Sequence, residues 1–117
     1  MFKSQDILNS YNFARQSDVV FSEIVTKTQF QTLNLKNVEI IDENERLIFY
    51  KLTELTLKEN DIIFCNTDVV KNLFKLLSKI KNLKNIKIIT NQTDTLIDKA
   101  LYNLKPACVN SWYSINV

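Results

Sequence analysis

Apolar and polar positions along the chain follow two patterns. Short runs rich in β-branched residues predict strands, and apolar residues at three- and four-residue spacing predict helices. The predicted strands are residues 18–25, 38–42, 47–52, 61–65, 86–90 and 108–112. The predicted helices begin near Ser4, Thr26, Asp68 and Asp94. This alternation predicts an α/β fold, a three-layer Rossmann-like domain with a mainly parallel sheet that covers residues 1–117 as one domain.

The clearest part of the pattern is a strand, a helix and a second strand between Asp61 and Thr90. An unbroken apolar run ends at Cys65, an amphipathic helix follows to about Ile80, and the next apolar run begins at Ile86. A length of about 30 residues is that of a parallel crossover unit, which is right-handed almost without exception. If all six apolar runs lie side by side, the polar residues that follow them should meet in one hollow.

The tetrapeptide Asn-Leu-Lys-Asn occurs twice, at Asn34–Asn37 and at Asn82–Asn85. Each copy lies between a predicted helix and an Ile/Val-rich strand. The chain contains no glycine, and asparagine is the next-best residue for the left-handed conformation that ends a helix. The two copies are therefore predicted to form the same helix-to-strand joint.

The composition excludes several kinds of chemistry. Without glycine, the chain cannot form the glycine-rich phosphate loops of nucleotide-binding proteins. Without histidine, it has no Ser-His-Asp or Cys-His catalysis, no histidine-containing zinc site and no histidine pH switch. Two cysteines are too few for a disulfide framework, and no apolar run reaches the length of a membrane span. We expect a cytoplasmic protein without a metal, a cofactor or a membrane contact.

Charge is unevenly distributed, although the net charge is only +2. Residues 71–87 contain six lysines and no acid, whereas residues 39–68 contain eight acids and three basic residues. The acidic segment 42–45 lies between two predicted strands and is typical of a hairpin loop. One face should be basic and another acidic. The lysine-rich helix has no set of aromatic residues interleaved with its lysines, and the chain has only two arginines, so we favour a solvated helix face over a nucleic-acid site.

Polar side chains follow three of the predicted strands. They are Asn66 and Asp68, Asn91 and Asp94, and Trp112 and Asn116. Ligands of open parallel sheets bind at the carboxyl ends of the strands, so these six residues are the candidate site for a sugar or a nucleotide. The alternative is structural: Asp68 and Asp94 would be ordinary helix N-caps, and Trp112 would pack in the core or at its rim.

Cys65 occupies the place of the nucleophile in phosphatases of the cysteine type, and Lys71 follows six residues later. Those enzymes need an arginine there, because lysine cannot bind phosphate through a planar fork. The segment between the two residues also lacks the glycine that such a cradle uses. We therefore interpret Cys65 as a buried core cysteine.

Four segments together resemble the amino-terminal half of exostosin-like glycosyltransferases of bacteria, phages and marine viruses. They are residues 17–23, 61–68, 88–94 and 105–117. In that family a strand ends in His-Asn-Ser-Asp or a similar sequence, and a Lys-Trp-Phe-x-x-Asn segment follows. The corresponding segments here are Thr90–Asp94 and Ser111–Asn116. The resemblance implies a sugar or sugar-nucleotide ligand.

The chain departs from that family in two respects. Thr90 stands where the family often has histidine, and the sequence stops at Val117, where the family continues into the lobe that holds most of the donor. The resemblance therefore implies one lobe of a longer protein, inactive alone and with no catalytic residue that we can name. Apolar surface left uncovered would favour a homo-oligomer.

Two further hypotheses remain open. The chain could be a non-enzymatic, viral-type interaction module that oligomerises through an exposed apolar strand or helix. It could also be an RNA- or DNA-binding α/β domain that uses the lysines of the central helix, and its affinity would then fall steeply with salt.

Overall fold

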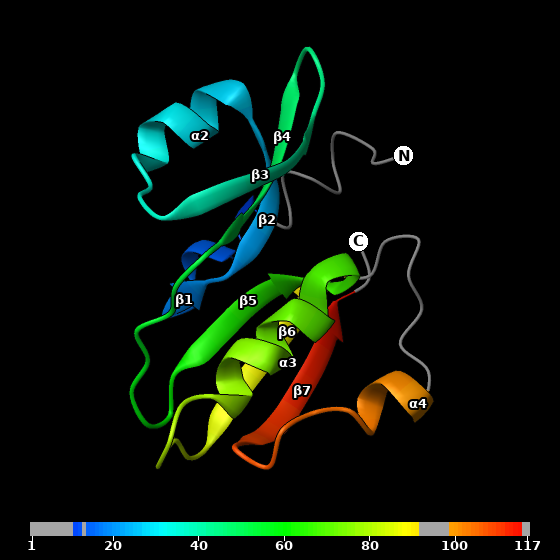
Figure 1. Ribbon diagram of the computed structural model, residues 1–117. Coiled ribbons are helices and arrows are strands. Elements are labelled where there is room, and N and C mark those ends of the chain that lie inside the picture. The colour runs from blue at the N-terminus through cyan, green and yellow to red at the C-terminus, as the bar shows by residue number, and fades with distance from the viewer. Residues whose placement is uncertain (1–10, 13, 92–98, 116–117) are drawn as a thin grey trace.

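The computed structural model describes residues 11–12, 14–91 and 99–115 and contains two β-sheets (Figure 1). The first sheet has four strands in the order β1-β5-β6-β7, all parallel to their neighbours. These strands are β1 (Val19–Val20), β5 (Ile62–Asn66), β6 (Ile86–Asn91) and β7 (Val109–Ile115). The second sheet is antiparallel, in the order β2-β4-β3, and comprises β2 (Ser22–Thr26), β4 (Leu47–Leu52) and β3 (Val38–Glu43). The fold is therefore α/β, with a mostly parallel sheet and a separate antiparallel one.

The expectation that six apolar runs lie side by side in one sheet is wrong. The predicted strand 18–25 divides at Phe21, so that β1 pairs with β5 and β2 pairs with β4. The Phe21 N–H donates to the carbonyl of Phe64, and the Phe21 carbonyl accepts from the N–H of Leu52, both at 2.8 Å. One fully buried residue thus joins the two sheets. The short segment between β3 and β4 can connect only antiparallel strands, so β3 pairs with β4. Strand β2 pairs with the other side of β4 and completes the antiparallel sheet.

The described helices are short. They are α2 (Lys27–Leu33), the 3₁₀ turn η1 (Thr67–Val69), α3 (Val70–Ser78) and α4 (Lys99–Tyr102). Thr26 and Gln29 form a reciprocal capping box at the start of α2, as the threonine in the predicted strand-to-helix junction allows. Residues 11–12 and 14–15 are also helical. The earlier part of that predicted helix, and the beginning of the helix predicted to follow Asp94, lie outside the described residues.

The main core lies between α3 and the parallel sheet. Leu73 and Leu77 of α3 are buried against a group that includes Ile63 and Ile88 of the sheet. Leu101 of α4 joins the same cluster, so α3 and α4 cover the same face of the sheet. The three-layer arrangement expected from the sequence, with helices on both faces, is not confirmed by the described residues.

The two Asn-Leu-Lys-Asn segments share the predicted left-handed backbone, but only the first copy ends a helix as predicted: Asn34 is the C-cap of α2, whereas α3 ends at Ser78 with Lys79 in the right-handed region. Asn34 and Asn37 have φ angles of 48° and 56°, and Asn82 and Asn85 have 63° and 58°. All four are in the left-handed region, where a residue with a Cβ pays a steric cost and glycine does not. Asn60, at φ 72°, is a further instance. Asparagine therefore takes the place of glycine at the left-handed positions that the structure describes. No helix among the described residues is long and apolar enough to span a membrane.

Candidate functional site

The carboxyl edge of the parallel sheet carries two of the predicted site residues side by side. Asn66 ends β5 and Asn91 ends β6, and the two are register partners in the parallel ladder. Both are buried, with Asn66 fully enclosed and Asn91 5% exposed. Thr67, the next residue, donates a hydrogen bond from its hydroxyl to the carbonyl of Asn91. The ends of the two strands are therefore held together.

Asn66 also begins the 3₁₀ turn that leads into α3. Its side-chain Oδ1 accepts from the N–H of Asp68 at 3.0 Å, and its own N–H donates to Ser22 Oγ at 2.8 Å. Asn66, and not Asp68, is therefore the N-cap. Asp68 is exposed in the first turn, where a negative charge favours the helix dipole. The Nδ2 group of Asn66 is buried and has no hydrogen-bond partner among the described residues.

Trp112 lies on the other face of the sheet. It is the register partner of Ile88, and its indole N–H donates to Thr90 Oγ1 at 3.0 Å. Its ring stacks on Tyr102 with the centroids 5.6 Å apart and contacts Phe74 edge-on at 5.5 Å. Since successive strand residues point to opposite faces, the structure does not bring Trp112 together with Asn66 and Asn91. This environment matches the structural alternative, in which Trp112 packs between α3, α4 and the sheet.

Of the six predicted site residues, the structure brings together Asn66 and Asn91, with Asp68 next to them. Asp94 and Asn116 lie outside the described residues.

Cys65 is a core residue, as predicted. Its Sγ is fully buried and lies 3.6 Å from Ser22 Oγ, which donates to it. Burial raises the pKa of the Cys65 thiol to about 12. The thiol is therefore protonated at neutral pH and cannot act as a nucleophile.

We expect a thiol reagent to distinguish the two cysteines. Cys108 is only partly buried, although burial also raises its pKa. Iodoacetamide should modify Cys108 at least about tenfold faster than Cys65 in the folded protein, since both access and thiolate content limit the rate. Mass spectrometry of the labelled peptides measures both rates. Cys108→Ser is the control and should leave no fast-reacting thiol, whereas equal rates at the two cysteines would contradict the burial of Cys65.

The sequence analysis missed a partly buried ion pair between Arg15 and Glu23 of the antiparallel sheet. Glu23 of β2 is 1% exposed, and its Oε1 accepts from the hydroxyl of Tyr50 at 2.7 Å and from the guanidinium of Arg15. Its Oε2 is buried without a hydrogen-bond partner among the described residues. Desolvation raises the pKa of the Glu23 carboxyl, and the contacts with Tyr50 and Arg15 oppose that effect. The sequence signal was an acid in the middle of a buried strand.

A hollow of about 320 Å³ lies beside this ion pair. Arg15 and Tyr50 line it together with the apolar side chains of Ala14, Val20, Leu33, Leu35 and Leu52 and with Ser17. Arg15 is held there by its pairing with Glu23 and by the ring of Tyr11, 4.2 Å from its guanidinium carbon. Two polar residues of this hollow, Arg15 and Tyr50, are thus already bonded to Glu23.

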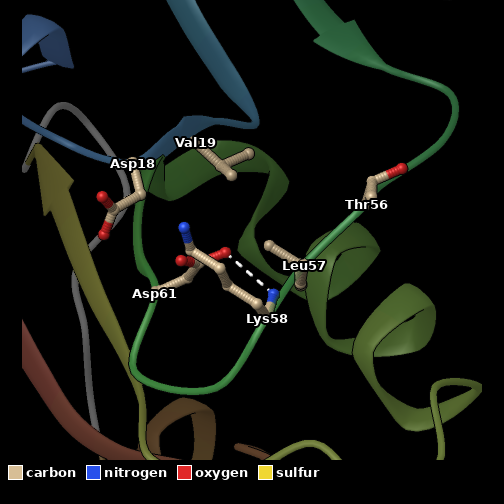
Figure 2. A pocket seen from close by; sticks show the side chains of 6 residues that line it. All are labelled: Asp18, Val19, Thr56, Leu57, Lys58 and Asp61. Atoms are coloured by element: carbon tan, nitrogen blue, oxygen red, sulfur yellow. Dashed lines mark hydrogen bonds between the residues drawn. The ribbon is translucent and has the colours of Figure 1, made fainter.

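A second hollow of about 320 Å³ lies at the opposite, amino edge of the parallel sheet (Figure 2). Asp18 and Asp61 precede β1 and β5 there, and the Lys58 side chain runs across the hollow towards Asp18 (Figure 2). Both carboxylates bind backbone: Asp61 accepts from the N–H of Lys58 at 2.9 Å, and Asp18 accepts from the N–H of Ile62 at 2.8 Å. Through these bonds the two acids stabilise the turn before β5. Parallel sheets bind ligands at the carboxyl edge, so we do not assign a ligand site to this hollow.

Comparisons with protein-family models, with curated proteins and with solved structures found no match. The described residues contain no group of three or more His, Cys, Asp or Glu side chains that could hold a metal ion. The argument for a function therefore depends on the geometry of the carboxyl edge.

Proposed function

We propose that this chain is a Rossmann-like, glycosyltransferase-like domain that binds a sugar or a sugar nucleotide at the carboxyl edge of its parallel sheet and does not catalyse transfer alone. One observation carries the proposal: Asn66 presents a buried amide Nδ2 without a partner among the described residues, next to Asn91 on the neighbouring strand. A buried donor without a partner costs about 1–3 kcal/mol. A ligand oxygen that accepts from it would remove that cost.

The chemistry of this edge suits a ligand rich in hydroxyl groups. Asparagine side chains offer both a donor and an acceptor, and the exposed Asp68 carboxylate accepts from hydroxyls. A sugar presents both functions on each hydroxyl. The resemblance of residues 61–68 and 88–94 to exostosin-like glycosyltransferases supports the same class of ligand. We expect this edge to bind the ligand and not to catalyse transfer alone.

Titration of the ¹⁵N-labelled chain with UDP-glucose, UDP and glucose tests this proposal. We expect chemical-shift changes at the backbone and side-chain amides of Asn66 and Asn91 and at the backbone amide of Asp68. Asn66→Ser keeps an oxygen that can cap η1 but removes the amide donor, so it should weaken binding about tenfold, as the loss of one good hydrogen bond implies. Asp18→Asn, at the other edge, is the control. If none of the three probes shifts these amides, the proposal is wrong.

The alternative function, an oligomeric interaction module, is supported by a different observation. Ile40 and Ile41 on the edge strand β3 are 45% and 38% exposed, and Tyr113 on the edge strand β7 is 57% exposed. Exposed apolar residues on sheet edges favour pairing between copies. Light scattering at several concentrations separates the two proposals, because a strict monomer that binds UDP-glucose would contradict the module.

A further inference from the structure

An open groove of about 260 Å³ runs between α3 and the segment after α4. Its lining consists of Lys71, Phe74, Lys75 and Ser78 from α3 and Leu104 from the other side. Leu104 is 55% exposed and the neighbouring Tyr102 is 44% exposed. Neither Asn66 nor Asn91 lines this groove.

Two features of this groove do not serve the fold. Leu104 leaves more than half of its surface in water, so its position does not derive from core burial. Lys71 and Lys75 lie one helical turn apart on the same side of α3, where their charges repel each other. No ion pair of either lysine occurs within the part of the chain that the structure describes. Ser78 donates its hydroxyl to the carbonyl of Phe74, so the lysines are the polar groups available to a ligand.

The described segments that form the groove and its flanks are rich in lysine, and the exposed Asp68 precedes the first of them along the chain. Residues 69–91 and 99–115 contain eight lysines and no acid. The two arginines, Arg15 and Arg46, belong to the other part of the chain. Such a surface attracts anions, and apolar walls under two ammonium groups favour an anion with a hydrocarbon chain. Lysine side chains suit this role, because their methylene stems extend the apolar wall while the charge stays in water.

We propose that the groove between α3 and Leu104 binds a linear alkyl carboxylate, with the chain on Phe74 and Leu104 and the carboxylate between Lys71 and Lys75. The size of the groove favours a single small ligand over a protein partner, whose interface would bury a much larger area. A nucleic-acid strand is disfavoured because one face of Tyr102 is already stacked on Trp112 and no arginine lines the groove. This binding site is separate from the proposed sugar site and does not depend on it.

The experiment is a calorimetric titration of the whole chain with hexanoate, octanoate, decanoate and dodecanoate below their micelle concentrations. Affinity should rise about three- to fourfold per methylene until the groove is filled. Decanol and decyltrimethylammonium provide the same chain with a neutral and a positive head group. We expect decanol to bind about tenfold more weakly than decanoate, and the cation not to bind.

Variants connect the binding to these residues. Lys71→Gln with Lys75→Gln should bring decanoate and decanol to the same affinity, which a general loss of structure would not do. Leu104→Asp, at an exposed position, should abolish binding of both. Lys81→Gln with Lys84→Gln removes two exposed lysines outside the groove and should change nothing. The proposal is overturned if decanoate and decanol bind equally to the unmodified chain, if Leu104→Asp binds as well as the parent, or if an oligothymidylate binds where no alkyl carboxylate does.

Discussion

Replacing Glu23 by alanine should lower the free energy of unfolding by about 1–3 kcal/mol, the usual cost of leaving a buried polar group without its hydrogen-bond partner. The substitution leaves the buried hydroxyl of Tyr50 and the guanidinium of Arg15 without their shared acceptor. It also leaves a cavity inside the antiparallel sheet. Urea unfolding followed by circular dichroism measures the effect.

Glu23→Gln is the matched control. The amide oxygen can still accept from Tyr50, and the buried charge is gone, so the loss of stability should be clearly smaller than in the alanine variant. An alanine variant as stable as the glutamine variant would show that the contacts of Tyr50 and Arg15 with Glu23 contribute little to the fold.

The comparison of the parent with Glu23→Gln also gives a prediction about the pH dependence of stability. Because desolvation raises the pKa of Glu23 above its ordinary value of 4.5, the folded state binds this proton more tightly than the unfolded chain does. The part of the stability that comes from this tighter proton binding is therefore fully present below about pH 4.5 and is lost as the pH rises through the folded-state pKa. Relative to Glu23→Gln, the parent should become less stable from about pH 4.5 upward. A difference that grows in favour of the parent over this range would mean that Arg15 and Tyr50 outweigh desolvation.

Sequence patterns were sufficient for the elements whose determinants are local. The strand and helix between Asp61 and Ser78 follow from an apolar run and a helical stripe, and β4 was predicted with the bounds it has. The Asn-Leu-Lys-Asn joints follow from the conformational preference of asparagine alone. In each case the physical cause lies within a few residues of its effect.

The division into two sheets could not be predicted in this way. Residues 18–25 form one apolar run, and nothing in its periodicity shows that the chain changes partners at Phe21. Which strand pairs with which is decided by long-range contacts, such as those of Phe21 with Phe64 and Leu52. Likewise, Glu23 was visible as an acid in a buried strand, but its partners Arg15 and Tyr50 come from separate segments.

The placement of Trp112 depends on a single residue. The register between β6 and β7 shifts between Ile86 and Lys87, so that Ile88 and not Ile89 opposes Trp112. Without this irregularity, Trp112 would face the side of the sheet that carries Asn66 and Asn91, because a slip of one residue reverses every side chain. Trp112 therefore lies apart from the rest of the predicted site because of a bulge, and no sequence pattern predicts that bulge.

The asparagines at left-handed positions should contribute to stability because of their backbone conformation. Replacing Asn34, Asn37, Asn82 and Asn85 together by alanine should lower the free energy of unfolding by about 4 kcal/mol. Alanine adopts the left-handed conformation less readily than asparagine does, and we expect this to cost about 1 kcal/mol at each position. The two joints lie in separate loops, so the effects of the two pairs should add. Urea unfolding of the two double variants and of the quadruple variant measures the cost and its additivity.

Glycine substitution at the same four positions separates conformation from side-chain contacts. The Asn85 side chain contacts Glu59 and Asn110 at the surface, at 3.5 and 3.3 Å, and either substitution removes these bonds. Glycine has no Cβ and adopts positive φ without cost, so the glycine variants should retain or exceed the stability of the parent while the alanine variants lose it. Asn72, exposed within α3, is the control: there alanine should stabilise by a few tenths of a kcal/mol through helix propensity, and glycine should destabilise. If alanine and glycine at the joints cost the same, the asparagine side chains and not their backbone angles would stabilise these turns.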